Sequence, residues 1–303
     1  MSAPAATPIA ALVEALADVW VAPDGRQAGL GGTQLEAPSA RRMAERLGQE
    51  LYQRLHAGSV DGDHGRRDST LEAALAEATP HRTSPIARTR PVDGAGEGVV
   101  LIDGLRVRVP PAMLTGPEML LPAARPALSP GHYLVDGPTG RMHGGPILRV
   151  YVHLRDPADA PARWHDVLTA LNDAGVTYRA KIVSKAGGYP RRDAMVVYLG
   201  PGHWQAAGLI RDTVDGRPAV GPECSLFAHR LAPGVAAAWD PDDPRPGRRG
   251  MSFGEHRARA TAEALLSDAD LAAGLAECFT AASIDAARPA RNHDSPSLPD
   301  LGL

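Results

Sequence analysis

Residues 147–199 read ILRVYVHLRDPADAPARWHDVLTALNDAGVTYRAKIVSKAGGYPRRDAMVVYL, and this stretch decides the fold. It carries the signals of a strand, a helix, a second strand, a glycine-rich turn and a third strand, in that order. The aliphatic residues of the first strand are Leu148, Val150, Val152 and Leu154. They alternate with Arg149, Tyr151 and His153, so the two sets lie on opposite faces of a sheet. One face is predicted to be core and the other to carry polar groups with a chemical role.

Cationic residues follow on the second strand and on the loop after it. Arg179 and Lys181 alternate with apolar residues and therefore share one face of that strand. The further cations in the turn and in the YPRRD cluster are Lys185, Arg191 and Arg192. We expect two neighbouring strands to present His153 and Lys181 on a common surface, with the loop arginines beside them.

The pattern as a whole predicts an α+β fold, with a mixed or antiparallel central sheet, flanking helices and an N-terminal helical region. A chain of 303 residues is long enough for one large domain or two. We divide it into an N-terminal helical region (1–60), a flexible linker or excursion (61–97), an α+β domain (98–285) and a disordered tail (286–303).

Charge and composition exclude several classes of protein. The net charge of −3 gives no general attraction to nucleic acid or to anionic membranes. Cys224 and Cys278 form neither a disulfide framework nor a metal-ligand motif, which favours a reducing cytoplasm. The apolar stretch near the N-terminus contains Glu14 and Asp18 and lacks a basic start, so no signal peptide is predicted. No apolar run approaches the ~20 residues of a membrane span.

Short local signals mark the other elements. Apolar residues at helical spacing predict a helix over 9–21, and Ser39 opens a second helix. A short helix is expected at Thr70–Glu77, and the Asp103–Gly104 dipeptide predicts a hairpin turn. Asp61, Asp63 and His64 have metal-ligand side chains, but solvated Asp-Gly turns have the same composition, so no metal site is assigned.

Ser252 and Glu255 form a capping box that begins a helix at Phe253. Arg257 lies in the first turns of that helix, where a cation is unfavourable unless an anion is nearby. Free amides at a helix start can also bind phosphate. The sequence leaves open whether Arg257 binds an anion or is an ordinary solvent-facing arginine.

The residue types of the central stretch fit β-elimination of phosphate. A neutral Lys181 would remove the Cα proton, and a protonated His153 would protonate the departing phosphate. Arginine suits the phosphate because its planar fork meets two oxygens at once. No P-loop or metal-binding carboxylate motif is present, so no cofactor or metal is expected. One lysine, one histidine and two arginines within forty residues also occur by chance.

The runs LRVYVHL, AKIVSKAGGYPRRDAMVVYL and SFGEHR resemble the HopA-type effector-like proteins over residues 95–285. Members of that family occur beside peptide kinases in ribosomal-peptide pathways, including those of class V lanthipeptides and thioamitides. The resemblance implies a phosphoserine/phosphothreonine lyase that gives dehydroalanine or dehydrobutyrine in a precursor peptide. The partners that it implies are the phosphorylated precursor, a separate peptide kinase and a cyclase.

The set of catalytic residues also resembles that of the phosphothreonine lyase effectors of enteric pathogens. That likeness implies Lys181 as base, His153 as acid and Arg192 as a phosphate ligand, with Arg191 and Arg257 as weaker counterparts. Those effectors carry a lysine two residues before the histidine, where this chain has Tyr151, which leaves the phosphate affinity open. The other candidate phosphate ligands are Arg149, Tyr151, Arg179 and Lys185.

A non-catalytic binding module is the alternative, because effector-like proteins can act by binding other proteins or phosphopeptides. Both kinds of protein would use the arginines, but only the lyase needs Lys181 and His153. Substitution of Lys181 therefore distinguishes the two hypotheses.

Overall fold

The computed structural model describes residues 7–58, 68–87, 98–102, 105–110, 114–115, 118–125, 128–142 and 144–303. The acidic residues and histidine weighed above as a metal site (61, 63 and 64) lie outside this set, as does the turn at 103–104. Within it, α-helices and antiparallel sheets combine, which confirms the predicted fold class.

A six-stranded antiparallel sheet forms the centre, in the order β13-β14-β10-β12-β11-β9. The strands are β9 (His132–Asp136), β10 (Leu148–Leu154), β11 (Tyr178–Val183), β12 (Arg191–Leu199), β13 (His229–Ala232) and β14 (Val235–Trp239). In the register, Val197 of β12 pairs with Val150 of β10 and with Ala180 of β11. The aliphatic residues of the three strands therefore share one face, as the alternation predicted.

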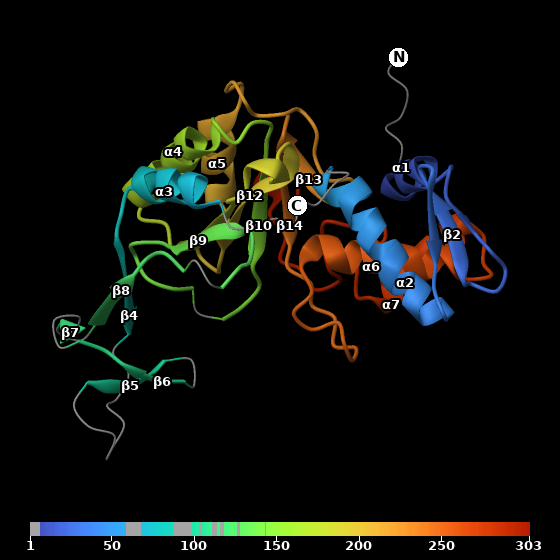
Figure 1. The fold of residues 1–303 in the computed structure, drawn as a ribbon, viewed down its shortest axis with the longest axis horizontal. Helices are drawn as coiled ribbons and strands as arrows, with labels where there is room; N and C mark the ends of the chain where they lie inside the picture. Colours follow the sequence, from blue (N-terminus) through green and yellow to red (C-terminus); the bar gives the residue numbers. More distant parts are fainter. Residues whose placement is uncertain are drawn as a thin grey trace.

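Helices α4 (Ala160–Asp173) and α5 (Ala206–Val214) cover the aliphatic face, and α3 (Ser69–Ala78) packs on α4 (Figure 1). On that face Trp164 of α4 meets Tyr133 edge to face, with ring centroids 6.3 Å apart. Helix α4 follows Asp159, and the chain then turns at Gly175, whose φ is +64°. Positive φ favours glycine at that position.

The N-terminal residues form a second lobe together with the C-terminal helices (Figure 1). This lobe contains α1 (Pro8–Ala15), a small sheet of β1 (Trp20–Val21), β2 (Gln27–Leu30) and β3 (Thr33–Glu36), α2 (Ala40–Leu51), the π-helical turn η1 (Tyr52–Ala57), α6 (Phe253–Leu265) and α7 (Leu271–Ala281). Ser39 caps α2 by accepting from the Arg42 amide, and α2 packs along α6. The N-terminal region is thus not a separate helical unit: it shares a lobe with helices assigned above to the α+β domain.

The region between the N-terminal lobe and the central sheet also contains regular structure. The helix expected at Thr70–Glu77 is α3, and β4 (Thr83–Ala87) pairs with β8 (Glu118–Pro122), which in turn pairs with β7 (Leu114–Thr115). The predicted hairpin is β5 (Val99–Ile102) with β6 (Leu105–Arg108). Residues 68–87 are therefore folded, in contrast to the flexible linker predicted for 61–97.

The C-terminal residues 286–303 pack against the protein, although their composition predicted disorder. Leu298, Leu301 and Leu303 are buried, and Leu301 ends a short turn of 3₁₀ helix, η4 (Pro299–Leu301). The Arg291 side chain folds back on the segment and donates to the Ser295 carbonyl at 2.7 Å. Three buried leucines give this polar segment the apolar anchor that its overall composition conceals.

Candidate active site

Lys181 lies in the middle of β11 and lines a cavity of about 640 Å³ on the polar side of the sheet. Its side chain is half-buried, and it makes no hydrogen bond or ion pair with any residue that the structure describes. The cavity wall beside it includes Arg179, Tyr198 and Asp240. An unpaired amine on a cavity wall can reach a bound molecule without first breaking an internal contact.

His153 lies at the end of β10 and is almost fully buried. Its Nδ1 atom is 3.1 Å from both the carbonyl oxygen and the carboxylate Oε2 of Glu223. A Cβ atom on Gly221 would lie only 2.3 Å from the imidazole, so this position requires glycine for the ring to fit. Burial lowers the pKa of His153 below its ordinary value of 6.5, and Arg192 lowers it further, whereas Glu223 opposes the shift.

The strands of His153 and Lys181 are not neighbours, contrary to the prediction from sequence. Strand β12 lies between them, and Val196 pairs with Tyr151 on one side and with Lys181 on the other. Lys181 and Tyr151 therefore leave the same face of the sheet, and His153 follows Tyr151 by two residues. Two strand spacings, about 10 Å, separate the β10 and β11 backbones. Lys181 lines the cavity, whereas His153 does not.

A register shift in β12 brings further polar groups toward His153. Val152 pairs with Met195 and Leu154 with Arg191, so the β12 residues 192–194 all oppose His153. Bulges of this kind re-aim side chains and are frequent beside active sites. The positive charge of Arg192 acts on His153 from this bulge, and its NH1 atom donates to the Arg54 carbonyl at 3.2 Å. The structure thus brings together the predicted acid and the predicted phosphate ligand.

Arg191 is tied into a buried network rather than extended into the cavity. Its Nε atom contacts the Asp193 carboxylate, and its NH2 atom is 2.5 Å from the Tyr52 hydroxyl. Tyr52 donates to Asp193 at 3.0 Å, and His56 Nε2 approaches the same carboxylate at 3.5 Å. Sequence analysis missed Tyr52, His56 and Asp193 as site residues. The four-residue spacing of Tyr52 and His56 on one helical face was the available signal.

The Asp193 carboxylate is expected to stabilise the protein more at neutral than at acidic pH. Burial alone would raise its pKa, but Arg191 and His56 hold the pKa well below the usual value of 3.8. An aspartate with a depressed folded-state pKa contributes stability above its unfolded pKa, and this is lost as the pH falls.

Replacing Asp193 with asparagine is therefore expected to cost about 3 kcal/mol at pH 7, because Arg191 loses its buried counter-charge. Urea unfolding of both proteins at pH 7 and pH 3 measures the effect, and the difference should shrink at pH 3. The exposed Asp212→Asn variant is the control. An equal difference at both pH values would contradict the assignment.

His132 of β9 is a second residue that sequence analysis did not single out. Burial lowers its pKa to about 4, and the nearby charge of Lys181 contributes to the shift. The ring is therefore neutral at neutral pH, and it lies close enough to Lys181 and Arg191 for their charges to lower its pKa. Sequence alone gave no reason to place β9 beside β11.

The remaining candidates on the polar face make internal contacts. Arg149 contacts the Asp240 carboxylate and lies 5.0 Å from the Tyr198 ring centre. Tyr151 is buried, with no hydrogen-bond partner for its hydroxyl among the described residues. Arg179 donates to Asp136 at 2.7 Å but keeps about a third of its side chain exposed at the cavity. Lys185 follows β11 and lies near Gly131.

Arg257 lies in the interior of the α6 lobe, close enough to Arg149, Tyr151 and Asp240 for its charge to act on them, but outside the cavity lining. The guanidinium is fully buried and donates to the carbonyl oxygens of Pro289 and Arg291 and to the Asn292 side chain at 2.8–3.1 Å. It also lies 4.6 Å from the Phe253 ring centre. The capping box that begins α6 at Phe253 is confirmed, with Glu255 bonded to the Ser252 amide. Arg257 is therefore neither solvent-facing nor available to an anion.

No group of three or more histidine, cysteine, aspartate or glutamate side chains is arranged to hold a metal ion within the described part of the chain. Among the helices that the structure describes, none has the length and apolar character needed to cross a membrane.

The comparison with protein families identifies the relationship. A model of the HopA1 effector protein family matches residues 123–291, which is more than half of the chain and includes β10, β11 and β12. The chain belongs to the HopA1 effector protein family. Among curated proteins, no match was found.

Two solved structures are similar to this chain. An effector protein from Pseudomonas syringae pv. tomato strain DC3000 is 15% identical, with a TM-score of 0.51 over 85% of this chain and 91% of that one. An effector from Pseudomonas syringae pv. syringae strain 61 is 13% identical, with a TM-score of 0.48 over 82% and 95%. At these identities the first likeness supports a HopA1-like fold for this family member, but not an activity.

Proposed function

We propose that this HopA1 family member is a phosphoserine/phosphothreonine lyase. It would eliminate phosphate from a precursor peptide that a separate kinase has phosphorylated, leaving dehydroalanine or dehydrobutyrine. The observation that carries the proposal is the position of Lys181, an unpaired amine on a cavity wall, on the same sheet face as the His153–Arg192 pair. Further support comes from the sequence likeness to phosphothreonine lyases described above.

The reaction would proceed as a β-elimination. The neutral amine of Lys181 takes the Cα proton of the phosphorylated residue, and the electrons of that bond form the Cα–Cβ double bond. The Cβ–O bond breaks, and the imidazolium of His153 donates a proton to the departing phosphate. Arg192 stabilises the charge that develops on the leaving group. The products are the dehydro residue and inorganic phosphate.

Incubation of the purified protein with a synthetic phosphothreonine peptide tests the proposal directly. Mass spectrometry should show loss of phosphoric acid from the peptide, with and without a chelator. Addition of a small thiol should then label the new alkene. Release of phosphate that restores the threonine hydroxyl would instead show hydrolysis. Tight phosphopeptide binding without any loss of mass would favour the binding-module alternative.

Binding of a phosphopeptide is also expected to raise the pKa of His153. In the free protein, burial and Arg192 lower the pKa of the imidazole. The ring is therefore mostly neutral at pH 7 and must gain a proton to act as the acid. A phosphate dianion nearby favours the charged ring and shifts the pKa upward. Histidine ring NMR signals, titrated with and without phosphopeptide, measure the shift. The unphosphorylated peptide is the control, and an unchanged pKa would contradict the acid role.

A further inference from the structure

The cavity that Lys181 borders has several cationic groups on its wall. Arg141 and Arg179 also line it, and they direct Nε atoms at Asp136 from 3.4 and 2.7 Å. Arg125 approaches the same carboxylate at 3.3 Å, so three guanidinium groups surround one buried anion. A single carboxylate neutralises only one positive charge, so Asp136 cannot balance both Arg125 and Arg179. The Asp136 cluster therefore leaves the cavity wall with excess positive charge.

The second carboxylate of the wall does not remove this excess. Asp240 forms an ion pair with Arg149, whose positive charge balances it, and burial raises the pKa of Asp240. Lys181 makes no ion pair with a described residue, although its charge acts on Asp240 across the cavity. Two carboxylates, Asp136 and Asp240, thus face four cationic groups around a volume of about 640 Å³, namely Lys181, Arg125, Arg149 and Arg179. That volume exceeds what one phosphate would fill.

The cavity extends along the sheet in the direction away from His153. Arg179 precedes Lys181 by two residues on β11. It pairs with Tyr198 of β12, which pairs in turn with Arg149 of β10. His153 lies in the opposite direction, beyond the paired residues Lys181, Val196 and Tyr151. A phosphorylated residue held between His153 and Lys181 would therefore direct a neighbouring part of its peptide into the cavity. This placement rests on the proposed function.

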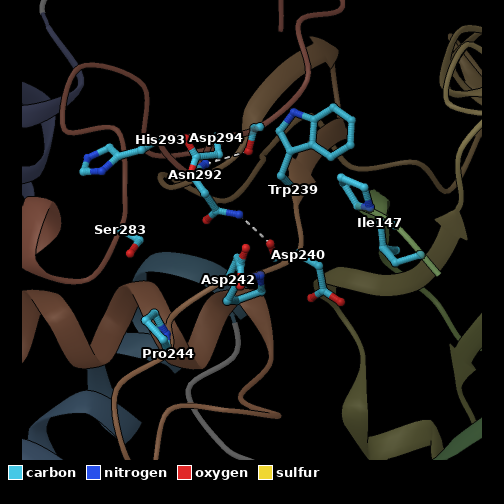
Figure 2. Close-up of a pocket in the computed structure, with 13 residues that line it drawn as sticks. Ile147, Trp239, Asp240, Asp242, Pro244, Ser283, Asn292, His293 and Asp294 are labelled. Atoms are coloured by element: carbon cyan, nitrogen blue, oxygen red, sulfur yellow. Dashed lines mark hydrogen bonds between the residues drawn. The ribbon is translucent and has the colours of Figure 1, made fainter.

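A second cavity, of about 700 Å³, adjoins the first at Gly145, Ile147 and Asp240 and has the opposite charge. Figure 2 shows Asp240, Asp242 and Asp294 around it. Asp242 and Asp294 are exposed and make no ion pair with the residues that the structure describes. Their charges disfavour an anion on that side and confine it to the cavity beside Lys181.

We propose that the Arg141–Arg179 cavity binds the carboxylate of an acidic residue that flanks the phosphorylated residue of the peptide. The subsite thus selects peptides that carry a second negative charge at one fixed distance from the phosphate. Charge complementarity in a partly buried site gives specificity, and its strength falls with salt.

Peptides with a methylene phosphonate in place of phosphothreonine test the subsite, because they cannot undergo elimination. Glutamate, glutamine or lysine is placed at each flanking position in turn, and binding to the unaltered protein is followed by fluorescence anisotropy. At one position glutamate should bind about fivefold more tightly than glutamine, and lysine more weakly than either. The preference should shrink at high salt.

The Arg179→Gln variant should lose the preference for glutamate, Arg179→Lys should keep part of it, and exposed Arg217→Gln should retain all of it. Equal binding of the glutamate and glutamine peptides at every position, or no binding of any peptide, would overturn the inference. So would an equal loss of affinity for both peptides in Arg179→Gln. Persistent glutamate preference without elimination of phosphothreonine would refute only the proposed function.

Discussion

Replacing Lys181 with alanine is expected to slow alkene formation by at least about a hundredfold, while phosphopeptide affinity stays within about fivefold. The amine is the only candidate base that lines the cavity among the described residues and has no internal partner. Removing it leaves no group to take the Cα proton, whereas Arg192 and the cavity arginines still hold the anion. Phosphate release from a phosphothreonine peptide and anisotropy with its phosphonate analogue measure the two quantities.

The chain provides a matched control for this experiment. It contains only two lysines, Lys181 and Lys185, which lie four residues apart. Lys185→Ala removes the same side chain from the turn after β11, outside the cavity lining. Even as a phosphate ligand Lys185 would affect binding rather than proton removal, so this variant should slow alkene formation far less than Lys181→Ala does. Lys181→Arg retains the positive charge but not a usable base, so it should be as inactive as Lys181→Ala. Full activity in Lys181→Ala would end the proposed mechanism.

The alternation in 147–199 predicted the strands and both faces of the sheet, because side-chain periodicity is a local property. It did not predict the strand order. The glycine-rich turn before Arg191 reverses the chain, and β12 then enters between β10 and β11. The position of β12 in the sheet depends on how α4 crosses the aliphatic face, which no local sequence pattern predicts. The separation of His153 from Lys181 follows from it.

Two other features that the sequence did not predict, strand β14 and the contacts of Asp193, have distinct physical causes. Strand β14 reads VAAAW, and alanine is a poor strand former, so burial rather than propensity decides its conformation. The residues around Asp193 come from η1 and β12, which are far apart in sequence and meet only when the two lobes pack. Asp193 itself was visible in the YPRRD cluster, but only its arginines suggested a role. The sequence therefore indicates the charged residues but not their partners.

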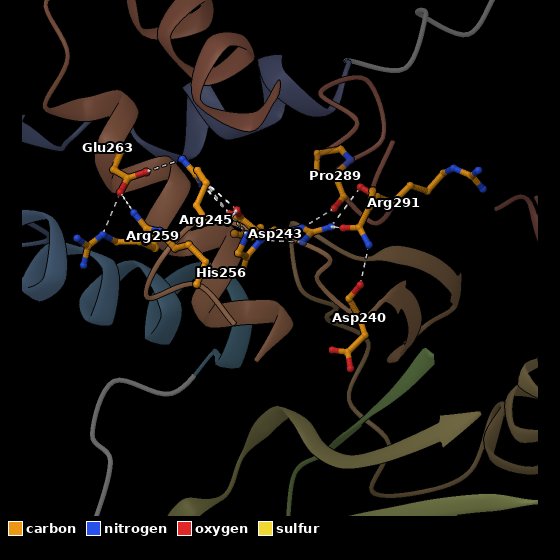
Figure 3. Close-up of polar contacts among 11 residues, drawn as sticks. Asp240, Asp243, Arg245, His256, Arg259, Glu263, Pro289 and Arg291 are labelled. Carbon is orange, nitrogen blue, oxygen red and sulfur yellow. Dashed lines mark hydrogen bonds and ion pairs between the residues drawn. The ribbon is translucent and has the colours of Figure 1, made fainter. Parts of the chain in front are cut away.

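Arg257 makes a different contribution, because its guanidinium joins α6 to the C-terminal segment. Burial lowers its pKa to about 9, so it remains charged at neutral pH. It donates to His256 Nδ1 at 2.9 Å, and His256 Nε2 in turn bonds to Asp243 at 2.9 Å. The low pKa of His256, about 4 because of burial and Arg257, fits a neutral ring in this chain of contacts (Figure 3).

Replacing Arg257 with leucine is accordingly expected to destabilise the protein by about 4 kcal/mol. The change leaves two buried carbonyl oxygens, the Asn292 side chain and His256 without a donor, and each unsatisfied group costs roughly 1–3 kcal/mol. Urea unfolding should show the loss, and hydrogen exchange should show weaker protection in residues 286–303. Arg41→Leu, which removes an exposed arginine, is the control. Unchanged stability with weaker phosphopeptide binding would instead make Arg257 a phosphate ligand.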